Sequence, residues 1–209
     1  MKLEKLKRIV LACVAVMLFA AGIAFTPMAQ AEGGFAGVGY GQSSVDIECD
    51  LDITCSADDS DSGFKIFGGY QFNPNFAFEV AYLDLGEAKI SGTDSFLGST
   101  TATIGVSGFN FAVVGSFPVG ERFGLMAKAG FFRWDVELNA SSSVFGSGSS
   151  SETGFDPMFG IGGSFNITEK FGVRVEYEKF LDVGDENVTG QSDVDLISAS
   201  LVFRFLGMA

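Results

Sequence analysis

Glu176 and Glu178 are the residues of this chain whose type and spacing could do chemistry. Two carboxylates two positions apart on a strand point to the same side and could act as general acid and base. Lys128, Arg174 and Arg204 can neutralise them, so structural ion pairing is the better interpretation. The sequence contains no His, which excludes Ser/His and Cys/His nucleophilic sites and His-ligated metal sites. We therefore expect no catalytic site and no enzyme activity.

The acidic stretch from Asp58 to Gly63 has the composition of a calcium-binding loop. With Gly63 in sixth place, the third and fifth places hold Ser, and the twelfth holds Gly69 instead of Glu, which excludes an EF-hand loop. Loose calcium binding by the acidic residues between Asp46 and Asp61 stays open beside a solvated acidic loop. We expect no metal site and no cofactor.

The charge balance of the chain excludes one class of partner. Its 209 residues include 13 basic and 26 acidic side chains, for a net charge of −13, and several of the basic ones lie in the first eight positions. A nucleic-acid-binding surface needs Lys and Arg to neutralise phosphates. We therefore expect no nucleic-acid partner. The length is that of one domain, or at most two.

The N-terminal segment has the features of an export signal. Basic residues precede an apolar run from Ile9 to Phe25, and the small residues Ala29 and Ala31 follow with one residue between them. This order is typical of a secretory signal peptide cleaved after Ala31. A retained membrane anchor and a lipoprotein processed at Cys13 stay open as alternatives. The predicted domains are a signal peptide at 1–31, a folded domain at 32–205 and a tail at 206–209.

Two cysteines, Cys49 and Cys55, lie in the exported part of the chain. An oxidising compartment favours a disulfide between them. The closed loop is short, so the expected stabilisation is only about 2 kcal/mol and the bond would chiefly shape a loop. The alternative is a pair of free thiols.

The exported part alternates apolar and other residues with a period of two, as β-strands do. Three connections are tight, and the others are long and rich in Asp, Ser, Gly and Thr. Tight turns at one end and long loops at the other are typical of an up-and-down transmembrane barrel. The fold class predicted is therefore an all-β, eight-stranded antiparallel barrel. Its strands are expected at about 35–42, 63–72, 76–85, 102–117, 123–136, 154–165, 171–180 and 194–205.

Phe residues bracket each tight turn and end the last strand. In a transmembrane barrel, aromatic side chains form girdles at the two membrane interfaces. We assign these residues to a lipid-facing girdle on the periplasmic side. They are Phe72, Phe76, Phe117, Phe123, Phe165, Phe171 and Phe205.

This assignment fixes the direction of every other side chain, since one register choice sorts a whole strand. The outward positions in the middle of the strands then hold no charge. Arg133 and Lys179 fall outward at the loop ends, where they can snorkel to head groups. The mid-strand charges all point inward and are expected to form one lumen charge network. Its predicted members are Lys65, Glu79, Lys128, Asp156, Arg174, Glu176, Glu178 and Arg204.

An apolar outer face and a polar interior separate two kinds of barrel. A secreted lipocalin-like barrel is apolar inside, and a soluble protein with this outer face would aggregate. A lipid slab accepts such a face, and a closed barrel pairs every backbone polar group within it. The alternative is a soluble β-sandwich in which the Phe residues form a core.

Several segments resemble the OmpA-like transmembrane β-barrel family of Gram-negative outer membranes. They are GFKIFGGYQF (63–72), EVAYLDLG (79–86), KAGFFRW (128–134), FGVRVEY (171–177) and LVFRF (201–205). The resemblance covers the exported part of the chain. Because the sequence stops at Ala209, we expect no periplasmic peptidoglycan-binding domain of the kind found in full-length OmpA.

The resemblance implies an integral, monomeric outer-membrane protein with a structural or surface-interaction role. Its expected partners are outer-membrane lipid and lipopolysaccharide, and, during biogenesis, periplasmic chaperones and the outer-membrane assembly machinery. Two other functions stay open. One is a narrow gated channel for ions or small solutes. The other is an adhesin or ligand-binding protein that acts through the acidic first loop and the Ser-rich third loop, Ser141 to Ser151.

Overall fold

The computed structural model describes residues 33–45, 56–58, 60–94, 98–142, 146–184 and 191–205. The predicted signal peptide, Cys49, Cys55 and the tail lie outside these residues. No helix among the described residues is long and apolar enough to cross a membrane. The strands are β1 (Gly33–Val45), β2 (Ser56–Asp58), β3 (Ser60–Asn73), β4 (Phe76–Asp94), β5 (Gly98–Val119), β6 (Phe123–Ser142), β7 (Gly146–Asn166), β8 (Phe171–Val183) and β9 (Ser192–Arg204).

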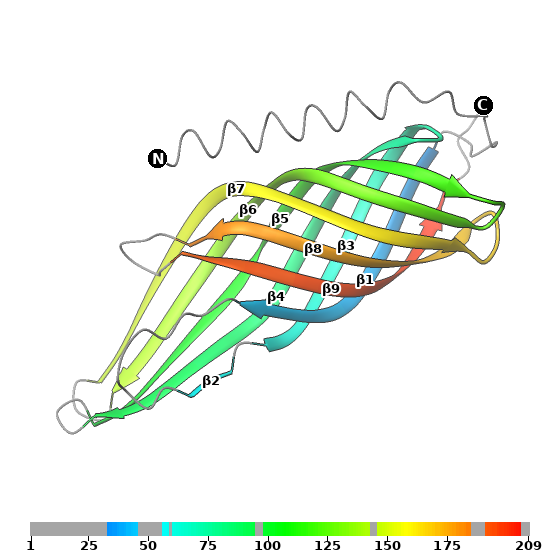
Figure 1. Cartoon of the computed structure of the whole chain (residues 1–209). Coiled ribbons are helices and arrows are strands. Elements are labelled where there is room, and N and C mark those ends of the chain that lie inside the picture. The colour runs from blue at the N-terminus through cyan, green and yellow to red at the C-terminus, as the bar shows by residue number, and fades with distance from the viewer. Residues whose placement is uncertain are drawn as a thin grey trace. The chain divides into compact units, whose positions relative to one another are not determined.

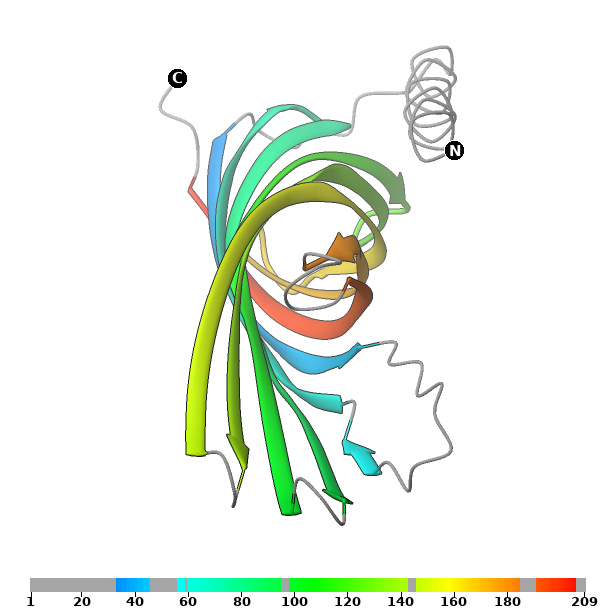
Figure 2. The same ribbon diagram turned by 90° about the vertical axis from the view of Figure 1, so that its left-hand side faces the viewer.

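The eight long strands form a closed antiparallel ring, which confirms the predicted fold class. Each strand pairs with the next along the chain, and β1 closes the ring by pairing with β9 from Phe35↔Arg204 to Val45↔Val194 (Figure 2). Closure leaves the barrel wall without an unpaired edge. Phe205 continues the seam, because its N–H donates to the Gly34 carbonyl at 2.7 Å.

Three tight connections lie at one end of the barrel, at the places where the sequence predicts turns. They join β3 to β4, β5 to β6 and β7 to β8. The first is held by the Asn73 side chain, whose Oδ1 accepts from the Asn75 and Phe76 N–H groups at 2.9 Å. Asn favours such local bonding to its own turn. In the third, the Thr168 hydroxyl accepts from the Phe171 N–H at 2.9 Å.

The predicted strand ends are wrong at the other end of the barrel. The sequence predicts loops at 86–100 and 137–153, whereas β4 pairs with β5 up to Asp94↔Gly98 and β6 pairs with β7 up to Ser142↔Gly146. Hydrophobic alternation stops at the rim of the barrel, but backbone pairing does not depend on it. Figure 1 shows the hairpins of β4–β5 and β6–β7 running well past the ends of β8 and β9.

A ninth strand, β2, was not predicted. It pairs with the extended part of β4 at Ser56↔Ser91, Ala57↔Ile90 and Asp58↔Lys89. Three residues are too few to show a period, so only the backbone pairing defines this strand. It covers part of one edge of the extended hairpins.

Candidate functional site

The candidate site is a cluster of charged side chains enclosed by the barrel wall. Strand alternation turns each of these residues inward. The cluster takes one residue each from β3, β4 and β6 and three from β8. We call it the lumen cluster, and its members are Lys65, Glu79, Lys128, Arg174, Glu176 and Glu178.

Lys128 is the centre of the lumen cluster. Its Nζ lies 2.9 Å from Glu79 Oε1, 2.7 Å from Glu176 Oε1 and 3.0 Å from Glu178 Oε1. Lys65 approaches from the opposite wall, with its Nζ 2.6 Å from Oε2 of both Glu176 and Glu178. The two carboxylates of β8 are therefore each shared between two ammonium groups.

Arg174 completes the lumen cluster toward the tight-turn end. Its Nη1 donates to Glu79 Oε2 at 2.6 Å and lies 3.8 Å from Glu176 Oε1. The guanidinium carbon also lies 5.4 Å and 5.0 Å from the ring centres of Phe35 and Phe67. Cations are attracted to aromatic faces at such distances. The aromatic partners were missed by sequence reasoning, although strand parity places both rings on the inner side.

Burial makes the charge balance of the lumen cluster decisive. The side chains are between 0% and 10% exposed. An uncompensated charge in such a place costs several kcal/mol, so cations and carboxylates must match. Three cations face three carboxylates, and the cluster as a whole is neutral.

Glycines on the neighbouring strand make room for these long side chains. A Cβ on Gly160 would lie 3.0 Å from Lys128 Cγ and 3.2 Å from Glu178 Cγ. A Cβ on Gly162 would lie 2.5 Å from the Val175 carbonyl oxygen and 3.0 Å from Glu176 Cγ. The inner side of β7 is therefore bare beside the lumen cluster.

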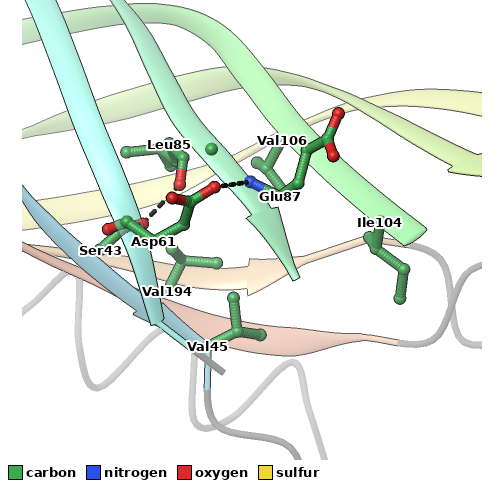
Figure 3. Close-up of a pocket in the computed structure, with 9 residues that line it drawn as sticks. Ser43, Val45, Asp61, Leu85, Glu87, Ile104, Val106 and Val194 are labelled. Carbon is green, nitrogen blue, oxygen red and sulfur yellow. Dashed lines mark hydrogen bonds between the residues drawn. The ribbon is translucent and has the colours of Figure 1, made fainter. Parts of the chain in front are cut away.

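An apolar layer closes the lumen on the loop side of the cluster. Leu83, Phe132 and Phe180 are 0% exposed and Leu196 is 1% exposed, and the Phe132 and Phe180 rings lie 4.6 Å apart between centres. Above them, Ser43, Asp61 and Glu87 line a small pocket at the rim (Figure 3). The Ser43 hydroxyl donates to the Leu85 carbonyl, and Asp61 Oδ2 accepts from the Glu87 N–H at 2.9 Å. The rim is thus tied across β1, β3 and β4.

Two residues assigned to the lumen charge network from sequence lie apart from the lumen cluster. Asp156 is bonded instead by Trp134, whose Nε1 donates to Oδ2 at 2.7 Å. Arg204 is half-buried near the tight turns, and its backbone N–H donates to the Lys170 carbonyl. Among the described residues Arg204 makes no ion pair. Parity gives the side of a strand but not the height along the barrel, and these two residues differ from the cluster in height.

The seven Phe residues of the predicted girdle lie beside the tight turns and at the end of β9. Five are exposed, between 45% for Phe72 and 62% for Phe123, and Phe76 and Phe165 are half-buried. The Phe123 and Phe165 ring centres lie 4.8 Å apart, and Phe203 lies 5.0 Å from both Phe171 and Phe205. Aromatic side chains therefore lie beside each tight turn and at the end of β9, and some of them are in ring contact across neighbouring strands.

The chemistry available to the lumen cluster is electrostatic. Each cation contacts at least two carboxylates, so none is left to polarise a substrate. Among the described residues, no group of three or more Cys, Asp or Glu side chains could hold a metal ion. Loose calcium binding stays open for the acidic residues between Asp46 and Asp61, of which residues 46–55 and 59 lie outside the described part of the chain.

The family model of the OmpA-like transmembrane domain matches residues 29–209. The chain belongs to the OmpA-like transmembrane domain family. Outer membrane protein A of Shigella flexneri is 29% identical over 144 residues, and that of Klebsiella aerogenes is 27% identical over 154. These matches cover 68% and 70% of this chain but only 40% of each relative. The chain thus matches less than half the length of these relatives.

Solved structures share the fold of this OmpA-like protein. Neisserial surface protein A superposes with a TM-score of 0.53 at 17% identity and covers 84% of this chain and 99% of that one. Ail, the attachment invasion locus protein of Yersinia pestis, superposes with a TM-score of 0.51 at 18% identity over 83% of this chain and 99% of that one. The family and its outer-membrane relatives locate the protein in the outer membrane of a Gram-negative bacterium.

Proposed function

We propose that this OmpA-like protein is a closed outer-membrane barrel with a structural or surface-interaction role. The observation that carries this proposal is the lumen cluster, whose side chains are buried and ion-paired beneath a buried apolar layer. An eight-stranded barrel is just wide enough for side chains to fill it. The barrel then works as an anchor, and the hairpins β4–β5 and β6–β7 are the parts it presents outside the cell.

The proposed orientation has the tight turns in the periplasm and the extended hairpins outside, as in bacterial barrels with short periplasmic turns. The Phe residues beside the turns then form the periplasmic girdle. The proposed partners are outer-membrane lipid, lipopolysaccharide and the machinery that assembles the barrel as a monomer. The signal peptide ending at Ala31 and the Cys49–Cys55 disulfide belong to the same proposal.

A deletion strain tests the proposed role. We expect loss of the protein to lower resistance to detergent or to reduce attachment to surfaces, with uptake of small solutes unchanged. Complementation with a chain whose hairpins are shortened beyond Glu87 and Glu137 separates detergent resistance from attachment. Detergent resistance needs the barrel alone, and attachment needs the hairpins. Slower solute uptake in the deletion strain, with the other two properties normal, would contradict the proposal.

A narrow gated channel is the second candidate, and shared ion pairs favour it. Lys128 contacts three carboxylates, so it can exchange one partner for another without becoming unpaired. The lumen also holds buried polar atoms that have no hydrogen-bond partner within the described part of the chain, at Asn110, Ser198 and Ser200. These atoms could line a hydrated path after rearrangement. Under this candidate, conductance depends on substitutions in the lumen cluster.

An adhesin-like role differs from that of the solved neighbour in one respect. The structure of Ail contains a heparin analogue, sucrose octasulfate, which is a polyanion. The loop end of this chain is acidic, and the basic side chains described there are Arg133 and Lys179. The acidic side chains are Asp61, Asp84, Glu87, Asp135, Glu137, Glu152, Asp156, Asp182, Asp193 and Asp195. Charge repulsion therefore favours a cationic partner over a sulfated one.

A further inference from the structure

The upper half of β7 is an edge that the barrel does not pair. β7 pairs with β6 along its whole length, from Phe123↔Phe165 to Ser142↔Gly146. Its pairing with β8 begins only at Met158↔Phe180. Within the described parts of the chain, the stretch from Gly146 to Pro157 therefore has β6 as its one strand neighbour. Figure 2 shows this stretch extending away from the ring, with its second side open.

The opposite edge of the same extended sheet is treated differently. There β4 is paired outward by β2 at Ser56↔Ser91 and the two following residues. No described segment plays this part for β7. Pro157 has no N–H to donate and lies where pairing to β8 stops, as Pro does at strand edges. The boundary of the open edge is therefore set by the sequence.

An open edge offers a row of unpaired N–H and C=O groups to another extended chain. Its side chains do not hinder approach, because Gly146 to Ser151 are small and exposed. Beside this edge the outer face is hollowed into an open depression of about 390 Å³, lined by Thr103, Asn139, Ser141, Ser147 and Ser149, among others. Alternate side chains of an added strand would lie beside this depression.

The acidic side chains near the open edge of β7 determine which kind of polypeptide segment can bind there. The sequence has no Lys or Arg between Arg133 and Lys170. Carboxylates lie on both faces of the sheet next to the open edge, with Asp135 and Glu137 on the outer face of β6 and Glu152 and Asp156 on the inner face of β7. An acidic added strand would be repelled, whereas Lys or Arg side chains would find carboxylates on both faces of the sheet.

We propose that the edge of β7 from Gly146 to Pro157 binds an extended, Lys- or Arg-bearing polypeptide segment as an added β-strand. This proposal deepens the surface-interaction role above and rests on it. Backbone hydrogen bonds hold the added strand, and the carboxylates select a basic one.

Binding of a series of peptides to the wild-type protein tests both the addition of a β-strand and the preference for basic side chains. The protein is reconstituted in neutral phosphatidylcholine vesicles, and binding of labelled peptides is followed by fluorescence anisotropy. The probe is a short peptide of alternating Lys and Thr. One control has Glu in place of Lys. Two further controls keep Lys but carry N-methyl groups on every second amide, one peptide on the odd-numbered amides and the other on the even-numbered amides, so that each edge of the peptide is blocked in turn. We expect binding of the probe, and at least about tenfold weaker binding of the Glu peptide and of both N-methylated peptides, because several hydrogen bonds are lost.

Equal binding of the N-methylated peptides would show attraction by charge alone and overturn strand addition. Equal binding of the Glu peptide would overturn the basic occupant. Absence of binding by all four peptides would overturn the proposal as a whole. The closed-lumen role would survive each of these results, since it is judged by solute uptake and conductance.

Variants of the protein locate the binding. Consecutive residues of a strand direct their N–H groups to opposite sides. Of the two variants Ser149→Pro and Ser150→Pro, one therefore removes an N–H from the open edge and leaves the hydrogen bonds to β6 intact, and the other removes an N–H that faces β6. We expect the variant that keeps the hydrogen bonds to β6 to migrate as a folded barrel and to bind the probe at least about tenfold more weakly. Glu152→Gln should also weaken binding, and Glu121→Gln, the same change beside a tight turn, should not. Folded variants at both Ser positions that keep full binding would place the site elsewhere.

Discussion

Lys128 carries the largest share of the charge compensation in the lumen. Replacing it with Met leaves three carboxylates against Lys65 and Arg174 in a buried place. Removing one partner of a buried ion pair costs about 3 to 5 kcal/mol. We expect Lys128→Met to lower the free energy of unfolding in lipid vesicles by this amount, measured by urea titration. Lys170→Met removes an exposed cation at a turn and should change it by less than about 0.5 kcal/mol.

A double substitution tests whether Lys128 and Glu178 act on each other. If they do, Glu178→Gln in the Lys128→Met background should restore part of the lost stability, because the surplus carboxylate is gone. Neighbouring groups show such coupling, at about 0.5 to 3 kcal/mol. Strictly additive effects of the two substitutions would show that the ion contacts at Lys128 do not stabilise the barrel as a unit.

For single residues, the sequence predicts which face of the barrel wall a side chain lies on, but not which side chain it contacts. The period of two assigns Lys65, Glu79 and Lys128 to the inner face, and the structure has them there. It does not predict that Lys65 contacts β8 from across the barrel, because that contact depends on strand tilt and stagger. Asp156 and Arg204 share the parity of the lumen cluster, yet height along the barrel separates them from it.

The lumen cluster needs the space that the glycines of β7 leave on the inner side of that strand. Gly162→Ala places a methyl group against the Val175 carbonyl and Glu176, and overpacking of this kind costs about 1 to 3 kcal/mol. Gly148→Ala makes the same change in the same strand where no atom lies within 4 Å. We expect urea unfolding to shift for the first variant and not for the second. Equal effects would mean that Gly162 serves the strand and not the cluster.

The hairpins of β4–β5 and β6–β7 give the second element-scale prediction. A short epitope inserted after Ser142 should bind antibody on intact cells. The same epitope inserted after Gly120, in a tight turn, should bind antibody only after the outer membrane is permeabilised. Labelling of the Gly120 insertion on intact cells would reverse the proposed orientation.

The ends of β4 to β7 on the loop side of the barrel could not be predicted from the sequence. Alternation of apolar residues reports contact with an apolar medium, so it stops where the barrel wall stops. The upper parts of β4 to β7 continue by backbone pairing between Ser-, Thr- and Gly-rich segments, which have no such period. The tight turns were predictable because Asn, Pro and Gly act locally.

Closure of the whole barrel depends on the seam between β1 and β9. Phe205 lies at its end, donates its N–H to Gly34 and packs on Phe203. Phe205→Asp places a charge at the interface, which by itself costs up to about 1 kcal/mol. We propose that the assembly machinery also recognises the aromatic end of β9. We therefore expect a larger loss, seen as low abundance of the heat-modifiable barrel in the outer membrane. Deleting residues 206–209 is the control and should leave abundance unchanged. Normal assembly of Phe205→Asp would place the recognition signal elsewhere.

Conductance across a planar lipid bilayer tests the closed lumen most directly. The lumen cluster and the apolar layer above it predict no steady single-channel current from the wild-type protein at moderate voltage. Lys128→Met should produce openings, because it breaks three ion contacts at once, while Lys170→Met should stay silent. Steady current from the wild-type protein would contradict the closed lumen, and silence of Lys128→Met would contradict the role given to its ion contacts.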